Sequence, residues 1–103
     1  MTRQQSIVPV DVYVLDVLLR DLVGHDKRPA AFLVYLNLYG TAARSGWQPV
    51  KASLRDIAEA TGLSKSAVAT AMKVLRRRHL VTTQTRFRTA RPRHRVLRHW
   101  RPT

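Results

Sequence analysis

The chain has 103 residues, no cysteine and a formal net charge of +13, with 19 Lys and Arg against 6 Asp and Glu. This length allows one domain with its own core, and the lack of cysteine excludes a disulfide framework, a thiolate zinc site and a cysteine nucleophile. No apolar run approaches the roughly 18 residues of a membrane helix, and Asp11 and Asp16 interrupt the N-terminal apolar stretch, which argues against a signal peptide. A reducing cytoplasm is the expected location.

The first predicted element is a helix over residues 9–23. Its apolar side chains recur at helical spacing, at Val12, Leu15, Leu19 and Leu22. Pro9 suits the first turn of a helix, because the N–H that proline lacks has no intrahelical partner there. Residues 10–15 also alternate like a strand, so a strand remains an alternative. A turn is expected over residues 24–28.

A second, strongly apolar helix is predicted from Pro29 to Arg44, ended by Ser45 and Gly46. The tyrosines Tyr13, Tyr35 and Tyr39 have apolar neighbours and are expected in the core. Together the first two helices carry more apolar surface than a lone small domain requires. The excess is either additional core or a dimer interface, so we treat residues 1–28 as a tail and helix that form a candidate dimerisation element.

Residues 47–52 are expected to form a short strand or an extended linker, and Pro49 restricts such a strand to a sheet edge. Ser53 and Asp56 have the spacing of a capping box, which begins a helix over residues 54–61. The residues expected on its buried side are Leu54, Ile57 and Ala58.

Gly62 ends that helix, and Ser64 is a second N-cap, for a helix over residues 65–78. The apolar face of this helix is predicted to consist of Val68, Ala71, Met72 and Leu75. Residues 80–87 are rich in β-branched side chains and predict a strand. Residues 88–94 are expected to form a hairpin loop, residues 95–100 a return strand and residues 101–103 a tail.

Aromatic and apolar residues indicate that the arginine-rich C-terminal part folds. They are Phe87, Val96, Leu97 and Trp100. Trp47 and Trp100 could stack on bases, but in so small a domain each is expected in the core.

The charge is distributed unevenly along the chain. Residues 1–60 carry all six acids and seven bases, whereas residues 61–103 carry twelve bases and no acid. Protein surfaces usually intersperse both signs, since like charges weaken the compact state. A polyanion is therefore expected to bind the C-terminal half, nucleic acid before an anionic membrane.

The most informative segment is LRDIAEATGLSKSAVATAMK, residues 54–73. It contains two helices joined by a tight turn, with the small residue Ala58 where the helices cross and Gly62 in the turn. Ile57, Leu63 and Val68 fall where the two helices would pack. This segment resembles the helix-turn-helix family of DNA-binding proteins.

The order of predicted elements extends the resemblance to the winged helix-turn-helix fold, mainly α with a small β-hairpin wing and here an extra N-terminal helix. It covers roughly residues 29–100, within the expected DNA-binding domain of residues 29–103. The sequence of residues 53–81, SLRDIAEATGLSKSAVATAMKVLRRRHLV, is similar to bacterial winged-helix transcription regulators, plasmid replication initiators and phage regulators. In that family the second helix of the motif enters the major groove, and the wing contacts backbone or minor groove.

The resemblance implies that one face of the helix over residues 65–78 contacts DNA. Carried over by position, its contact residues are Ser64, Lys65, Ser66, Ala69, Thr70, Lys73 and Arg77. Serine and threonine hydroxyls bind several bases, and an alanine methyl contacts the thymine methyl. The front of this helix has no Arg, Asn or Gln for bidentate base contacts, which leaves much of any sequence specificity to the wing.

The wing residues implied by the resemblance are Arg86, Arg88, Arg91, Arg93 and Arg95. Arg55 and Lys51 are weaker candidates for contacts to the DNA backbone. Of the three arginines that end the helix, Arg77 is expected to face phosphate, while at least one of Arg76 and Arg78 is merely solvated.

No enzyme signature is evident, and neither a cofactor, a metal nor a small-molecule ligand is expected. The expected function is sequence-specific double-stranded DNA binding by a homodimeric transcription regulator in the bacterial nucleoid, with two recognition helices about 34 Å apart. Three alternatives remain: an architectural or RNA-binding basic protein, a plasmid replication or partition accessory factor, and a protein-interaction domain that reuses the motif.

Overall fold

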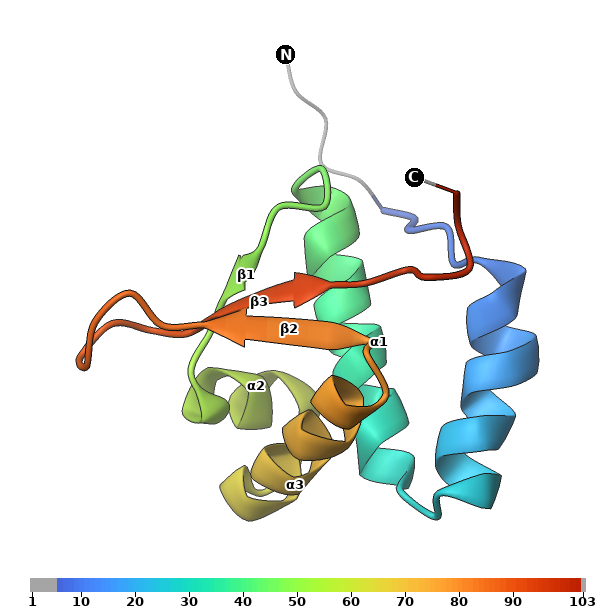
Figure 1. Ribbon diagram of the computed structural model, residues 1–103, viewed down its shortest axis with the longest axis horizontal. Helices are drawn as coiled ribbons and strands as arrows, with labels where there is room; N and C mark the ends of the chain where they lie inside the picture. Colours follow the sequence, from blue (N-terminus) through green and yellow to red (C-terminus); the bar gives the residue numbers. More distant parts are fainter. Residues whose placement is uncertain (1–5, 103) are drawn as a thin grey trace.

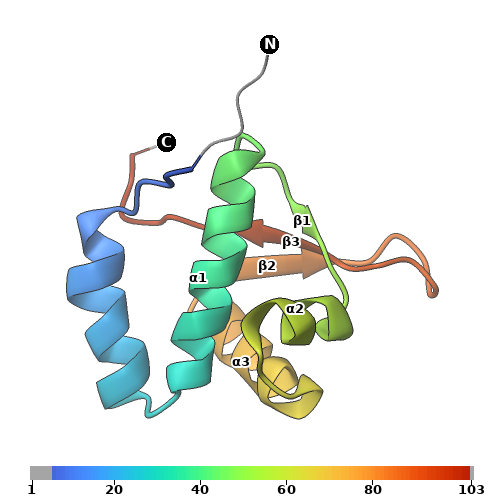
Figure 2. The same ribbon diagram turned by 180° about the vertical axis from the view of Figure 1, so that it is seen from behind.

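The computed structural model describes residues 6–102. Helices predominate, and a small antiparallel sheet packs against them (Figures 1 and 2), as the sequence predicts. The elements are, in chain order, η1 (Val14–Leu18), η2 (Arg20–His25), α1 (Pro29–Arg44), β1 (Val50–Lys51), α2 (Leu54–Thr61), α3 (Lys65–Arg77), β2 (Val81–Gln84) and β3 (Arg93–Val96). Among the described residues, no helix is long and apolar enough to cross a membrane.

The N-terminal segment is helical over residues 12–25, and η1 and η2 within it are wound as π-helix. The strand alternative is therefore wrong, and Pro9 lies before the helix rather than in its first turn. Of the apolar residues that give the helical spacing, Leu22 is buried together with Val14 and Leu18, whereas Val12, Leu15 and Leu19 are exposed. The i→i+5 bonding of a π-helix gives wider turns than the 3.6 residues that the predicted spacing assumes.

Helix α1 has the bounds that the sequence predicts, and it lies between the N-terminal helix, the sheet and α3 (Figure 2). Tyr35 and Tyr39 are buried, as expected. The Tyr35 hydroxyl donates to the Leu97 carbonyl at 2.9 Å, and burial raises the pKa of Tyr35 well above its usual range. This bond holds the end of the sheet against α1.

The capping and turn residues that the sequence predicts at the ends of α2 and α3 are confirmed. Ser53 and Asp56 form the predicted capping box, Gly62 takes a left-handed conformation (φ 80°), and Ser64 caps α3. The predicted apolar face of α3 is buried throughout. Leu54 is an exception on α2: it is 37 % exposed, because the first residue of the helix lies at its free end.

The sheet has the strand order β1-β3-β2, and both pairs are antiparallel. β1 is an edge strand after Pro49, as expected. The predicted hairpin strands are shifted: β2 ends at Gln84, which pairs with Arg93, so β3 begins two residues earlier than expected. Phe87 consequently lies in the β2–β3 loop, 64 % exposed, and not in a strand.

The structure assigns His94, which the sequence places in a basic loop, to the buried face of β3. Its ring nitrogens contact Thr83 Oγ1 on β2 at 3.0 Å and the Ala52 carbonyl after β1 at 2.9 Å. Burial lowers the pKa of His94 below its ordinary value. The neutral ring therefore links the three strands.

The C-terminal segment folds back onto the start of the N-terminal helix. Asp11 accepts from Trp100 Nε1 at 2.9 Å and from Arg101 Nε and Nη2, both at 2.7 Å. Those bonds hold the pKa of Asp11 well below its usual range. Tyr13 stacks on Trp100 at 4.5 Å between ring centroids. Trp47 and Trp100 both pack against the core, as predicted. Arg101, which was expected in a tail, is instead bound to Asp11.

Acid is expected to destabilise the fold in two stages. The folded-state pKa of His94 is lowered, so the unfolded chain binds more protons and stability declines once the pH falls below about 6.5. The Arg78 hydrogen bonds lower the pKa of Asp26 from 3.8 to about 2, so its contribution is present above pH 3.8 and is lost as the pH falls toward 2. Thermal melts across this range measure both stages. His94→Gln should remove only the first, and an unchanged profile would contradict that assignment.

Candidate nucleic-acid interface

The outer face of α3 presents polar and basic side chains in one stripe. Ser66, Thr70, Lys73 and Arg77 are all exposed, and their spacing of three or four residues places them on one side of the helix. The opposite side is held in the core by Val68, Ala71, Met72 and Leu75. Packing therefore fixes which residues of α3 face outward.

The remaining predicted residues of this helix lie at its start and along its flank. Lys65 is exposed and Ala69 is half-buried. The Ser64 hydroxyl accepts from the Ala67 amide at 3.1 Å and lies 3.3 Å from Ser66 Oγ, so capping occupies part of its bonding capacity. Ser64 thus caps α3, as predicted, in addition to being a candidate for a DNA contact.

One flank of α3 adjoins β2, and the other adjoins the start of α1. Arg76 Nη1 donates to Thr83 Oγ1 on β2 at 3.2 Å. On the other flank, Thr70 lines a shallow hollow together with Lys27 and Arg28. These two exposed bases extend the positive surface beside α3. Local sequence patterns do not link them to α3, because Arg28 and Lys27 precede Thr70 by 42 and 43 positions.

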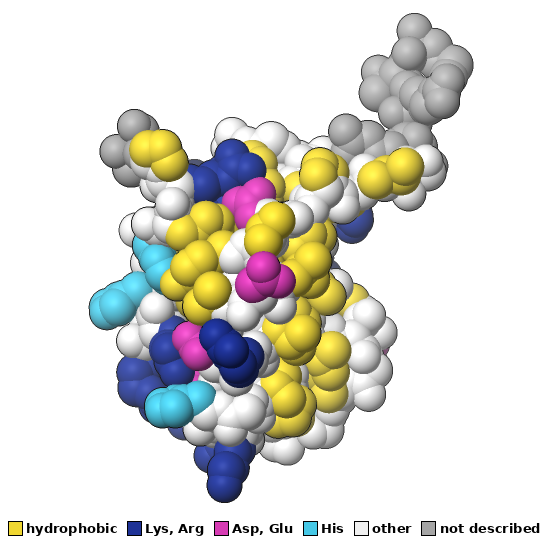
Figure 3. Space-filling model, turned by 90° about the vertical axis from the view of Figure 1, so that its right-hand side faces the viewer, with side chains coloured by type: hydrophobic (Ala, Val, Ile, Leu, Met, Phe, Trp, Pro, Cys, Tyr) yellow, Lys and Arg dark blue, Asp and Glu magenta, His cyan; other side chains and the backbone are white. Residues whose placement is uncertain are grey.

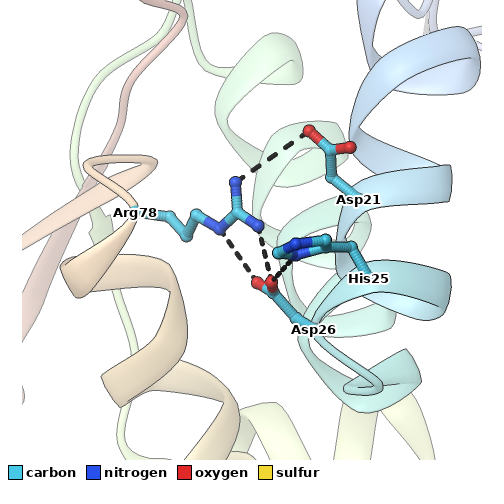
Figure 4. A network of polar contacts seen from close by, with 4 residues as sticks. All are labelled: Asp21, His25, Asp26 and Arg78. Atoms are coloured by element: carbon cyan, nitrogen blue, oxygen red, sulfur yellow. Dashed lines mark hydrogen bonds and ion pairs between the residues drawn. The ribbon is translucent and has the colours of Figure 1, made fainter.

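Arg78 is held within the fold, unlike the adjacent Arg77. Its guanidinium donates from Nε to Asp26 Oδ2 at 2.9 Å and from Nη2 to Asp26 Oδ1, and Nη1 lies 3.9 Å from Asp21 Oδ2. His25 Nδ1 lies 3.0 Å from the same Asp26 carboxylate (Figure 4). This network joins the end of α3 to η2, so Arg78 is not merely solvated. The expectation that at least one of Arg76 and Arg78 is merely solvated is not met by either residue, since Arg76 bonds Thr83.

The β2–β3 loop projects beyond the sheet on the side where α2 lies (Figures 1 and 2). Arg86 and Arg88 are exposed on it, and among the described residues neither forms an ion pair. Arg91 lies 3.4 Å from Asp56 Oδ2 at the start of α2. That contact ties the base of the loop to the helical part of the protein.

The structure separates Arg93 and Arg95 from the other loop arginines. Both belong to β3, where His94 and Val96 point into the core, so Arg93 and Arg95 lie on the opposite face of the sheet. They line a hollow there with Thr82 and Gln84. The five predicted wing arginines therefore divide between a projecting loop and an outer sheet face.

The weaker candidates lie at exposed positions on α2 and β1. Arg55 pairs with Glu59 at 3.3 Å across one turn of α2, and Lys51 is exposed on the edge strand β1. Five of the six acidic side chains form ion pairs with basic residues of the described chain, and Asp16 is the exception. The acids are thus largely paired within the fold, whereas Lys73 and Arg77 on α3 and Arg86 and Arg88 on the loop form no ion pair among the described residues.

No group of three or more His, Asp or Glu within residues 6–102 is arranged to hold a metal ion. Comparison of the chain with family models, with curated proteins and with solved structures finds no match. The interpretation of this interface therefore depends on its own geometry and charge.

Proposed function

We propose that the protein is a winged helix-turn-helix DNA-binding protein that acts as a transcription regulator. In this proposal α2 and α3 are the two helices of the motif, α3 lies in the major groove, and the β2–β3 loop is the wing on the backbone or minor groove.

The observation that carries the proposal is the outward stripe of α3. A capped helix of 13 residues is fixed by its buried face, and its other face presents two hydroxyls and two cations without a carboxylate. A helix so exposed fits the major groove, which admits one α-helix. The stripe also lies in the half of the chain that has twelve bases and no acid.

The chemistry of the stripe assigns different tasks to its members. Lys73 and Arg77 would contact phosphates and set the position of the helix, whereas Ser66 and Thr70 would contact base edges. Lys27 and Arg28 extend the phosphate-binding surface on one side, and Arg86 and Arg88 extend it at the loop. Most of the affinity is thereby electrostatic and salt-dependent.

Selection from a random double-stranded DNA pool, followed by titration of the best site at two salt concentrations, tests this function. A regulator should prefer one short motif over bulk DNA by roughly 10³-fold or more. Enrichment of no motif, with binding that weakens steeply in salt, would overturn sequence-specific regulation.

One observation favours a second function, that of an architectural or RNA-binding protein. The middle of the α3 stripe lacks Asn, Gln and Arg, the side chains that read bases by paired hydrogen bonds. Competition of bound DNA with double-stranded RNA separates the two functions, because a regulator should retain its DNA site.

A further inference from the structure

The N-terminal helix has a second apolar face, which the fold does not cover. Val12, Leu15, Leu19 and Val23 are 36–69 % exposed along it, and Leu33 on the adjoining α1 is 47 % exposed. Figure 3 shows these hydrophobic side chains gathered down the helix and toward α1. Contiguous apolar patches on a soluble domain mark interaction surfaces.

The core does not need this face. The same helix already buries Val14, Leu18 and Leu22 in the core, and its η2 part packs against α1. A helix that is apolar on two sides requires a second partner for the side that its own domain leaves open.

Two exposed charges accompany the apolar stripe. Asp16 and Arg20 lie one turn apart on the helix, and neither forms an ion pair with any residue of the described chain. The stripe is centred between positions 17 and 18, and the midpoint of the two charges is at position 18. The apolar residues and the charges are therefore centred within one residue of each other.

We propose that this face binds a second copy of the chain, with the two N-terminal helices antiparallel about a two-fold axis at this centre. Such a pairing is self-complementary, since each patch contacts its own equivalent. It sets Asp16 of each copy beside Arg20 of the other, and it covers the apolar stripe on both.

The charges argue against an anionic membrane as the occupant. Asp16 and Asp21 belong to this helix, and all six acids of the chain lie in its first 60 residues. An anionic lipid surface would be repelled here and attracted to the basic half instead.

The dimer has a consequence for DNA binding, and this consequence rests on the proposed function. The β2–β3 loop projects on the side of the molecule away from the N-terminal helix (Figure 1), so pairing leaves both loops free. Two copies of α3 on one particle would then bind an inverted repeat.

Charge exchange tests the interface on the full chain without DNA, by sedimentation equilibrium across micromolar concentrations. Asp16→Arg and Arg20→Asp each place like charges together and should weaken the wild-type dimer at least tenfold. The double exchange should restore it, and a mixture of the two single variants should form heterodimers. These positions are exposed, so folding is expected to persist, and circular dichroism checks it.

Leu19→Gln tests the apolar part against Leu54→Gln, which changes an equally exposed leucine on α2. The first should dissociate the dimer and the second should not. A wild-type monomer at all concentrations, or failure of the double exchange to restore pairing, would overturn the proposal. The proposal would also be overturned if the protein were monomeric and bound anionic vesicles, with Leu19→Gln abolishing that binding. DNA affinity, measured separately, reports on the proposed function independently.

Discussion

Removal of three exposed cations, by Lys73→Ala, Arg77→Ala and Arg88→Ala together, is expected to weaken DNA binding several hundred-fold at about 0.1 M salt. Each phosphate contact contributes about 0.9 to the slope of log K against log salt, so three lost contacts reduce the slope by about 2.7. Extrapolated from about 1 M, where electrostatic binding is small, that slope corresponds to roughly 500-fold at 0.1 M. Titrations at several salt concentrations measure both quantities.

Arg44→Ala is the matched control. It also removes one exposed cation, but from the end of α1 rather than from α3 or the loop. Its effect on the salt slope should be close to zero, whereas Lys73→Ala alone should lower the slope by about 1. Equal effects of Arg44→Ala and Lys73→Ala on the salt slope would mean that the net charge of the protein, and not a defined face, governs DNA binding.

Arg78→Ala should lower stability by about 2 kcal/mol, since it removes two charged hydrogen bonds to Asp26. For a domain of this size that corresponds to a decrease in Tm of about 10 °C. The pair is worth more than a solvent-exposed ion pair because the Asp26 side chain is only 15 % exposed. Thermal and urea unfolding at neutral pH measure the loss.

The neighbouring Arg77 provides the control for Arg78. Arg77→Ala should change Tm little, as surface substitutions rarely exceed about 0.5 kcal/mol, but it should weaken DNA binding. Arg78→Ala should instead lower Tm and leave DNA binding nearly unchanged, provided that binding is measured below the Tm of this variant. A double-mutant cycle of Arg78→Ala with Asp26→Asn should show strong coupling, and additive effects would contradict a direct pair.

Local signals in the sequence were sufficient for most of the helical part. The bounds of α1 and α2, both serine caps and the buried face of α3 all depend on residues within one or two turns of each other. The strands were harder to place, because the register that pairs Gln84 with Arg93 involves positions on both sides of a loop. Phe87 looked like a strand residue until that register excluded it.

The N-terminal helix shows a different limit. The spacing of its apolar residues predicts a helix correctly, but the sequence left open whether the excess apolar residues belong to the core or to a dimer interface. The structure buries Val14, Leu18 and Leu22 and leaves Val12, Leu15 and Leu19 outside. The excess of apolar residues was visible in the sequence, but not which residues would remain exposed.

The sequence by itself determined the helices with their caps, the outward stripe of α3 and the concentration of positive charge in the second half. These features depend on local spacing and on composition. Only the tertiary structure decided which arginines are free, because an ion pair is made by proximity in space. Arg78 reaches Asp26 across 52 positions and Arg101 reaches Asp11 across 90, whereas Arg77 and Arg88 keep their charge for a partner.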